Sequence, residues 1–307
     1  MFCYSFHHGR ERDMAERNWK RYNEQLVKRG AFYISLDFLE NWTAELNGMN
    51  TGKRGRPFVF PHTFMRFMAF LHVAFLPYRQ MEGFLRKLSE YIPAVHAADY
   101  STICKRMNTV AIGEPFLDIT DGDVVVAVDS SGMKVSSRGE WMRHTWGVRK
   151  GWIKVHIAVD VTTKQLISLE ITDEHTHDGT MLKPLIERSR KKNTMGVRRV
   201  LADGAYDSRE NFTYLATNGI QAGIKTRKNA TVRARGCPSR ARCVKEQRAL
   251  GYEGWRDKYR YGQRWAAETY FSGVKRTFGE TTRSRTTEGL FQEVRMKFMF
   301  YNMLIAV

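Results

Sequence analysis

The stretch Tyr261-Gly-Gln-Arg264-Trp-Ala-Ala-Glu268-Thr-Tyr-Phe-Ser-Gly-Val-Lys275 carries a tyrosine, an arginine, a glutamate and a lysine at offsets of 0, 3, 7 and 14. Because an α-helix turns by about 100° per residue, it would bring these four side chains within about 60° of one another. A neighbouring arc would be apolar, as expected for a helix packed on a core, and it consists of Ala267, Phe271, Val274 and Phe278. The stretch therefore predicts a helix with the Glu268 carboxylate at the edge of its buried face, although a surface helix with a stripe of ion pairs would share the pattern.

Two aspartates elsewhere in the chain follow apolar runs that are typical of buried strands. Asp129 comes after Val124-Val-Val-Ala-Val128, and Asp203 comes after Val197-Arg-Arg-Val-Leu-Ala202. Each is followed by a short segment rich in Gly and Ser, which predicts that each carboxylate lies at the end of its strand. Two strand-end aspartates and one helix glutamate are the oxygen ligands needed to hold two Mg²⁺ ions.

With these residues, the chain resembles the DDE transposases of insertion sequences, in the insertion-sequence four/five group marked by Tyr-x2-Arg-x3-Glu-x6-Lys. The signature is complete here in residue type and spacing. The likeness is close over the C-terminal two-thirds and looser over the N-terminal third, through Leu76-Pro-Tyr-Arg-Gln-Met-Glu82 and Asp99-Tyr-Ser-Thr-Ile-Cys104. The resemblance implies that Asp129, Asp203 and Glu268 are both the catalytic triad and the ligands of two Mg²⁺ ions, for which Mn²⁺ can substitute.

The resemblance also implies an activity and its partners. Such a protein binds the terminal inverted repeats of its element, cuts the DNA by Mg²⁺-dependent hydrolysis and joins the 3′ ends to target DNA, as a homodimer in the synaptic complex. Arg264 and Lys275 would clamp phosphates near the cut, and Tyr261 would donate a hydrogen bond to the DNA backbone. Two alternatives stay open: a nuclease or resolvase on the same fold that cuts without joining, and an inactive DNA-binding repressor derived from a transposase. The intact triad argues against the repressor.

The composition agrees with a nucleic-acid partner. The formal net charge is +18 over 307 residues, and the pI of about 9.9 indicates a polyanionic partner. The longest apolar stretch, residues 58–75, is interrupted by Pro61, His62, Arg66 and His72, so it does not predict a membrane span. The first residues lack the apolar segment of a signal peptide, and a cytoplasmic, nucleoid-associated protein of a prokaryote is expected.

An all-helical DNA-binding region is predicted for residues 1–118. Its helices are expected at residues 11–29, 36–46, 61–76, 79–91 and 101–110. Ser101 is predicted to cap the last of these, which would expose Lys105 and Arg106. The last three helices have the proportions of a helix-turn-helix DNA binder. A helical bundle that only packs on the catalytic domain is the alternative.

The segment Gly52-Lys-Arg-Gly-Arg-Pro57 within this region is cationic and too rich in Gly and Pro for a long helix or strand. Lys53, Arg54 and Arg56 would suit the minor groove of A·T-rich DNA. An ordinary basic linker would have the same composition.

A ribonuclease-H-like catalytic domain is predicted for residues 119–307, as a mixed α/β sheet flanked by helices. The expected order is three antiparallel strands (124–128, 152–161, 165–171), a helix (179–192), a strand (197–202), a helix (209–217) and a strand (221–225). A last amphipathic helix is expected from residue 288 to the C-terminus.

Three connections in this domain carry further expectations. The basic loop over residues 134–150 contains Trp146, which is predicted to contact DNA, although a hairpin pinned to the core by tryptophan would look similar. A basic insertion at about 226–260 is expected to contact DNA too, with Cys237 and Cys243 as reduced thiols in a solvated loop. Asp178 is predicted to cap the helix that follows it.

Overall fold

The computed structural model describes residues 18–32, 38–93, 95–110, 124–135, 151–192, 196–284 and 286–306. The predicted domain boundary between residues 118 and 119 lies outside these ranges, as does most of the basic loop with Trp146. Among the described residues, no helix combines the length and the apolar composition needed to cross a bilayer.

The N-terminal part of the described chain is helical, as the sequence predicts. Its helices are α1 (Trp19–Phe32), α2 (Phe38–Asn50), α3 (His62–Ala74), α4 (Tyr78–Tyr91) and α5 (Tyr100–Met107). Prolines set two of the starts, because Pro61 and Pro77 directly precede α3 and α4. Aromatic rings join α2 to α3, with the ring centroids of Trp42 and Phe64 5.1 Å apart.

The predicted cap of α5 is wrong by two residues. Asp99, rather than Ser101, caps the helix, and its carboxylate accepts hydrogen bonds from the backbone N–H groups of Ser101 and Thr102 at 3.0 and 2.9 Å. An ionised carboxylate accepts both bonds at once and also suits the positive end of the helix dipole. Hydrogen bonds from the Ser101 and Thr102 hydroxyls, together with these backbone bonds, lower the pKa of Asp99 well below its usual value.

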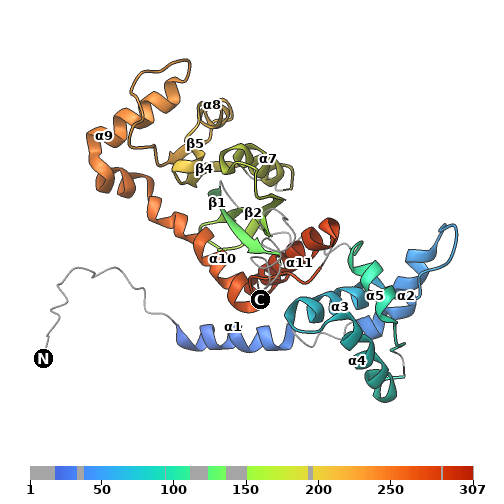
Figure 1. Ribbon diagram of the computed structural model, residues 1–307. Helices are drawn as coiled ribbons and strands as arrows, with labels where there is room; N and C mark the ends of the chain where they lie inside the picture. Colours follow the sequence, from blue (N-terminus) through green and yellow to red (C-terminus); the bar gives the residue numbers. More distant parts are fainter. Residues whose placement is uncertain are drawn as a thin grey trace, which may run out of the picture.

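One mixed sheet forms the centre of the remaining chain (Figure 1). Within the described residues its strands are β1 (Val124–Lys134), β2 (Trp152–Asp160), β3 (Leu166–Asp173), β4 (Val197–Ala202) and β5 (Gln221–Ile224). They lie in the order β3-β2-β1-β4-β5. The first three strands are antiparallel neighbours, as predicted, whereas β4 runs parallel to β1 and β5 parallel to β4. The parallel pairs require crossovers, which the intervening helices provide.

Helices cover both faces of the sheet (Figure 1). One face carries the short 3₁₀ helix η1 (Asp178–Met181), α7 (Leu182–Lys192) and α8 (Arg209–Thr217). The other face carries α10 (Trp265–Phe278) and α11 (Thr287–Ala306). The apolar cluster on this second face continues into α2–α5, and Phe70 of α3 packs edge-on against Phe300 of α11 at 5.4 Å. The N-terminal helices therefore share a core with the helix pair that covers the sheet.

Helix α9 (Pro238–Tyr259) occupies most of the predicted basic insertion. It is bent at Gly251, whose φ of 65° lies in the left-handed region that glycine tolerates best. The expected solvated loop around the cysteines is wrong, because Cys237 and Cys243 are buried in the apolar cluster beneath α8 and β5. Both thiols are free, as predicted. The arginines around these buried cysteines give the segment a polar composition, which is why its sequence predicts a solvated loop.

Candidate active site

The register of the sheet places two of the predicted carboxylates side by side. Ala127 of β1 pairs with Leu201 of β4, and Asp129 and Asp203 each follow two residues later. Because side chains alternate along a strand and neighbouring parallel strands lie about 4.8 Å apart, both aspartates point to the face of the sheet that α10 covers. Asp129 is not a strand end, however, since β1 continues to Lys134 through its pairing with β2. It lies where the parallel neighbour β4 ends.

Asp203 directly follows β4 and begins the 3₁₀ helix η2 (Gly204–Tyr206). One of its carboxylate oxygens accepts a hydrogen bond from the backbone N–H of Ala205 at 2.9 Å. This bond fixes the side chain at the tip of the strand while leaving it only half-buried. The local sequence Asp-Gly-Ala-Tyr thus positions the carboxylate through its own turn.

Helix α10 carries the third carboxylate, Glu268, which shares an arginine with Asp129. Glu268 lies in its first turn, next to Ala266 and Ala267, which are buried. The Arg264 guanidinium forms an ion pair with Glu268 and lies with its other terminal nitrogen 3.4 Å from an Asp129 carboxylate oxygen. One arginine therefore joins the helix carboxylate to the strand carboxylate, 139 residues away in the sequence.

The predicted single helix over residues 261–278 is interrupted. Tyr261–Arg264 form a separate 3₁₀ helix, η3, and the α-helix begins at Trp265. Tyr261 is only 6% exposed, and its hydroxyl donates a hydrogen bond to the carbonyl oxygen of Ala202 at 3.2 Å. This residue was predicted to contact DNA, but in the structure it ties the turn before Arg264 to the end of β4.

Lys275 lies two helical turns beyond Glu268, on the same side of α10. Its ammonium group donates a hydrogen bond to the Ser131 hydroxyl at 2.9 Å, and within the part of the chain that the structure describes it forms no ion pair with Asp129, Asp203 or Glu268. The predicted polar stripe thus has two parts. Arg264 pairs with two of the carboxylates, whereas Lys275 places a positive charge beside Ser131 of β1.

Burial and like charge both act on Asp129. Burial, together with the Asp203 and Glu268 carboxylates, raises the pKa of Asp129 to about 6, against the lowering effects of the Ser130 N–H group and Arg264. The raised pKa means that the surroundings stabilise the ionised carboxylate too little, although the Arg264 guanidinium already lies beside it. Such a group binds an additional cation favourably.

The side chains around Asp129 are the candidate metal ligands. Within the ranges that the structure describes, no three His, Cys, Asp or Glu side chains lie close enough together to hold one metal ion. The donor chemistry nevertheless fits a hard cation, because Mg²⁺ takes carboxylate oxygens. Arg264 now occupies the positive position between Asp129 and Glu268. A metal ion could therefore bind between Asp129 and Glu268 only if the Arg264 guanidinium moved away from them.

Comparison with known proteins shows the family. A family model with the description "Transposase DDE domain" matches residues 120–303, more than half of the chain, and a second model with the same description matches residues 27–138. This chain belongs to the DDE transposase family. Among solved structures, a cryo-EM structure of the piggyBac transposase synaptic complex with hairpin DNA is similar to this DDE transposase at a TM-score of 0.40 and 11% sequence identity. That match covers 92% of this chain and 74% of the other, and the family assignment rests on the family models.

The cations predicted to bind DNA in the N-terminal region of this transposase differ in exposure. Arg54, Arg56 and Lys105 are exposed. Lys53 and Arg106 are half-buried, and both cations lie over the Phe58 ring, 4.8 and 4.4 Å from its centroid. Trp146 lies outside the described residues.

Two polar networks of the transposase were not foreseen from the sequence. Asp178 does not cap a helix. Its carboxylate pairs with Lys154 at 2.9 Å and lies 3.9 Å from Nδ1 of the buried His156. Burial lowers the pKa of His156 to about 4, so the imidazole is neutral at pH 7. Lys154 and His156 lie two residues apart on β2, so their side chains share one face of the strand. This spacing is the feature of the sequence from which their proximity could have been predicted.

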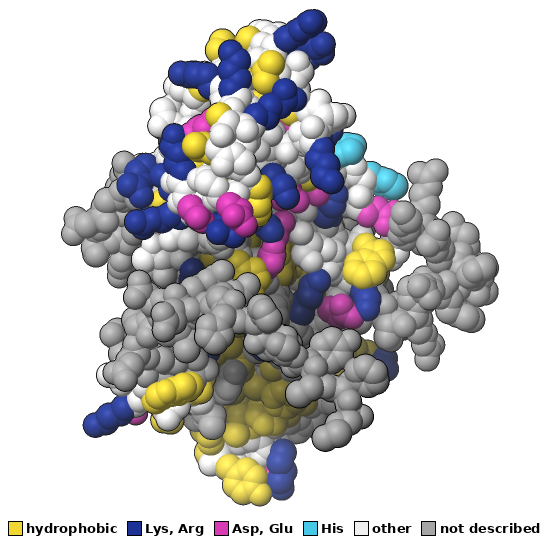
Figure 2. All heavy atoms as spheres, turned by 90° about the vertical axis from the view of Figure 1, so that its left-hand side faces the viewer, with side chains coloured by type: hydrophobic (Ala, Val, Ile, Leu, Met, Phe, Trp, Pro, Cys, Tyr) yellow, Lys and Arg dark blue, Asp and Glu magenta, His cyan; other side chains and the backbone are white. Residues whose placement is uncertain are grey.

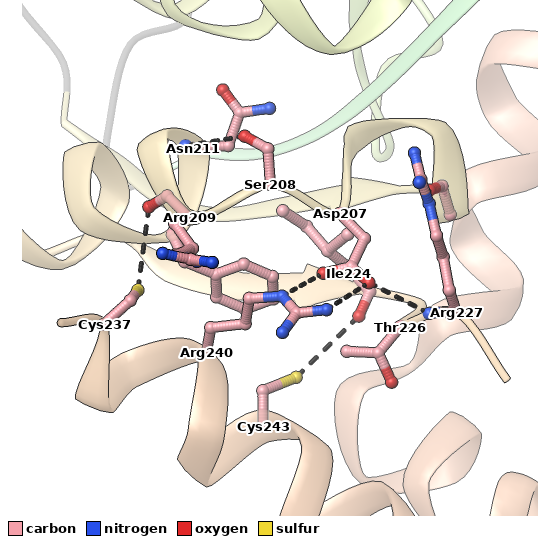
Figure 3. A network of polar contacts seen from close by, with 12 residues as sticks. Asp207, Ser208, Arg209, Asn211, Ile224, Thr226, Arg227, Cys237, Arg240 and Cys243 are labelled. Carbon is pink, nitrogen blue, oxygen red and sulfur yellow. Dashed lines mark hydrogen bonds and ion pairs between the residues drawn. The ribbon is translucent and has the colours of Figure 1, made fainter. Parts of the chain in front are cut away.

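The second network joins α9 to the loop after Asp203 (Figure 3). The Asp207 side chain is fully buried and receives two hydrogen bonds from Arg240, at 2.6 and 2.9 Å. It accepts a third from the backbone N–H of Arg227 at 3.0 Å. The first turn of α9 is therefore tied to the segment that carries Asp203.

Proposed function

We propose that this protein cuts DNA by metal-dependent phosphodiester hydrolysis and joins the 3′ ends of an insertion sequence to target DNA. We also propose that it belongs to the group marked by Tyr-x2-Arg-x3-Glu-x6-Lys. The observation that carries the proposal is that Arg264 pairs with both Asp129 and Glu268, while the strand register places Asp203 beside Asp129. The strand order and directions support a ribonuclease-H-like sheet, as the resemblance implies.

In this proposal Asp129, Asp203 and Glu268 would hold the metal. Two Mg²⁺ ions bound there, or Mn²⁺ in their place, would supply charge to deprotonate the attacking oxygen and to stabilise the leaving oxygen. The protein contributes the half-buried setting, which strengthens the attraction between the carboxylates and any cation. Arg264 neutralises two of the carboxylates in the present structure and is placed to hold a substrate phosphate once it releases them.

Lys275 is proposed to bind a DNA phosphate, because its ammonium group donates to the Ser131 hydroxyl and, among the described residues, forms no ion pair with a triad carboxylate. Replacing it by Gln removes one charge and keeps the hydrogen-bonding capacity. We expect Lys275→Gln to weaken binding by similar factors on all DNA sequences and to reduce the slope of log K against log salt by about one unit. Fluorescence anisotropy titrations at several salt concentrations measure this slope.

Lys183→Gln is the matched control, since Lys183 lies on α7, on the opposite face of the sheet, where it pairs with Glu187. It should leave the slope unchanged. An unchanged slope for Lys275→Gln together with a lower melting temperature would make Lys275 a structural residue.

The basic surface is proposed to carry the rest of the DNA. On the face drawn in Figure 2, Lys and Arg side chains are spread over the upper part, and a smaller group of Asp and Glu side chains lies near the middle. We assign recognition of the element ends to a helical N-terminal region, residues 1–118, and backbone contacts to the insertion at about 226–260 of a catalytic domain, residues 119–307. Two copies would form the synaptic complex.

The experiment that tests this function must separate joining from cutting. The full chain is incubated with labelled end DNA of its element, a supercoiled target plasmid and Mg²⁺, and the products are sized on denaturing gels. A transposase gives both cleaved ends and ends covalently joined to the target. Cleaved ends without joined products would favour the nuclease, and binding without cleavage would favour the repressor.

A further inference from the structure

Lys225 lies at the carboxyl end of β5, one strand beyond Asp203. Ala202 of β4 pairs with Ile224 of β5, and the backbone N–H of Lys225 donates a hydrogen bond to the Ala202 carbonyl at 3.2 Å. Asp203 and Lys225 therefore follow the paired residues at the same level. Because Ala202 and Ile224 belong to the apolar cluster on the α7 face, alternation along a strand places the next residues on the α10 face. Lys225 thus extends the row that Asp129 and Asp203 begin.

The Lys225 ammonium lies over an aromatic ring instead of beside the carboxylate. It is 4.9 Å from the centroid of the Tyr252 ring, and within the described ranges it forms no ion pair with Asp203. Both side chains reach solvent, since Lys225 is exposed and Tyr252 is 52% exposed. An ammonium over a ring keeps its charge and the N–H donors that point outward. It can therefore bind an anion without leaving the ring.

The Tyr252 ring is fixed by the part of α9 that follows the bend at Gly251. Trp255, three residues later and on the same side of the helix, is fully buried and packs against the Tyr261 ring at 4.8 Å. Burial is the largest cause of the raised pKa of Tyr261, about 12, and Asp203 and Tyr252 both contribute to the rise. The Tyr252 ring therefore lies beside the turn that carries Asp203.

Lys225 and Lys275 lie on opposite sides of the two aspartates. Strand β4 lies between β1 and β5, and Lys275 bonds to Ser131 of β1. A DNA strand that crosses the ends of these strands would meet a positive charge on each side of the metal site. We propose that the Lys225 ammonium binds a DNA phosphate on the β5 side, and that the Tyr252 ring holds it away from the Asp203 carboxylate, which stays free for the metal. This inference rests on the proposed metal-dependent function.

The ring matters because Lys225 could otherwise pair with Asp203. Neighbouring strands lie about 4.8 Å apart, and a lysine side chain spans that distance. A paired ammonium would compete with a metal ion for the same carboxylate oxygens. Exposed cation–π contacts and exposed ion pairs have similar, small free energies, so the ring can decide between the two positions.

Lys225→Gln tests the phosphate contact in the full chain without metal. It should weaken the binding of end DNA and of random duplex by similar factors, and it should reduce the slope of log K against log salt by about one unit. Lys183→Gln on the opposite face of the sheet is again the control and should keep the wild-type slope. An unchanged slope in Lys225→Gln would overturn the phosphate contact.

Tyr252→Leu tests the role of the ring. We expect the affinity for Mn²⁺, measured by the electron paramagnetic resonance signal of the free ion, to fall about two- to fivefold. Tyr252→Phe keeps a ring and should bind Mn²⁺ like the wild type. Adding Lys225→Gln to Tyr252→Leu removes the competing ammonium and should restore the affinity.

Tyr91→Leu is the matched control, because the exposed Tyr91 of α4 holds the Lys87 ammonium 5.2 Å from its ring centroid in the same kind of contact. It should leave Mn²⁺ affinity unchanged. Wild-type affinity in Tyr252→Leu, or a loss that Lys225→Gln does not restore, would overturn the role of the ring. Failure of the wild type to bind Mn²⁺, or wild-type affinity in Asp203→Asn, would instead overturn the metal-dependent function.

Discussion

Asp129→Asn is expected to lower the rate of DNA cleavage by about 10³-fold or more while leaving DNA affinity within about twofold of the wild type. The carboxylate lies between Asp203, which directly follows β4, and the Arg264–Glu268 pair, and in the proposed function it would be a ligand of the metal. Several kcal/mol of transition-state stabilisation depend on such a site, and each 1.36 kcal/mol is a factor of ten in rate. Single-turnover cleavage of end DNA and anisotropy binding measure the two quantities.

Asp257→Asn is the control for this prediction, because Asp257 is an exposed residue of α9 that pairs with its neighbour Arg256. It should cut at the wild-type rate. Cleavage by Asp129→Asn at the wild-type rate would remove Asp129 from the active site. A parallel loss of DNA binding and of melting temperature would mean that the substitution had unfolded the protein.

Arg240→Met is expected to destabilise the protein by about 3–5 kcal/mol, because it leaves the fully buried Asp207 carboxylate without its charged partner. Since about 2–4 °C is lost per kcal/mol in chains of this size, the melting temperature should fall by roughly 10 °C or more. Circular dichroism during heating and urea unfolding measure the change. Cleavage should also slow, since Asp207 lies in the loop that Asp203 opens.

A second variant separates lost charge pairing from lost packing. Asp207→Leu combined with Arg240→Met removes both charges, and it should be more stable than Arg240→Met alone. Arg86→Met is the surface control, because the Arg86 side chain is 71% exposed in its pair with Glu82 and should change stability by less than about 1 kcal/mol. Equal melting temperatures for Arg240→Met and Arg86→Met would show that the buried pair does not stabilise the fold.

The order of helices and strands was predictable because apolar periodicity is local. The β-branched run before Asp129 and the apolar arc of α10 each occupy one segment, and the structure has a strand and a helix there. That β1 would continue past Asp129 was not predictable, since those residues, Ser130-Ser-Gly-Met-Lys134, are mostly polar or small. Their strand conformation comes from pairing with β2, a contact between distant segments.

The partners of the site residues were less predictable than their identities. Spacing alone placed Tyr261 on one helix with Arg264, but a left-handed residue, Arg260 with φ 48°, ends α9 and forces a new start. Arg264 pairs with both Asp129 and Glu268 only because α10 packs on β1. Similarly, the local sequence predicts Asp178 as a helix cap, because its partners Lys154 and His156 lie on β2, more than twenty residues earlier in the chain. Residue type is local, whereas contacts across the sheet are not.

The central claim is that Asp129, Asp203 and Glu268 form one metal centre in the working protein. The most direct measurement is anomalous X-ray diffraction from crystals of the full chain with end DNA and Mn²⁺. We predict Mn²⁺ peaks at about 2.1 Å from oxygens of all three carboxylates, with Arg264 no longer between Asp129 and Glu268. An ordered α10 with Mn²⁺ bound elsewhere, or with Glu268 too far from the ions to act as a ligand, would contradict the claim.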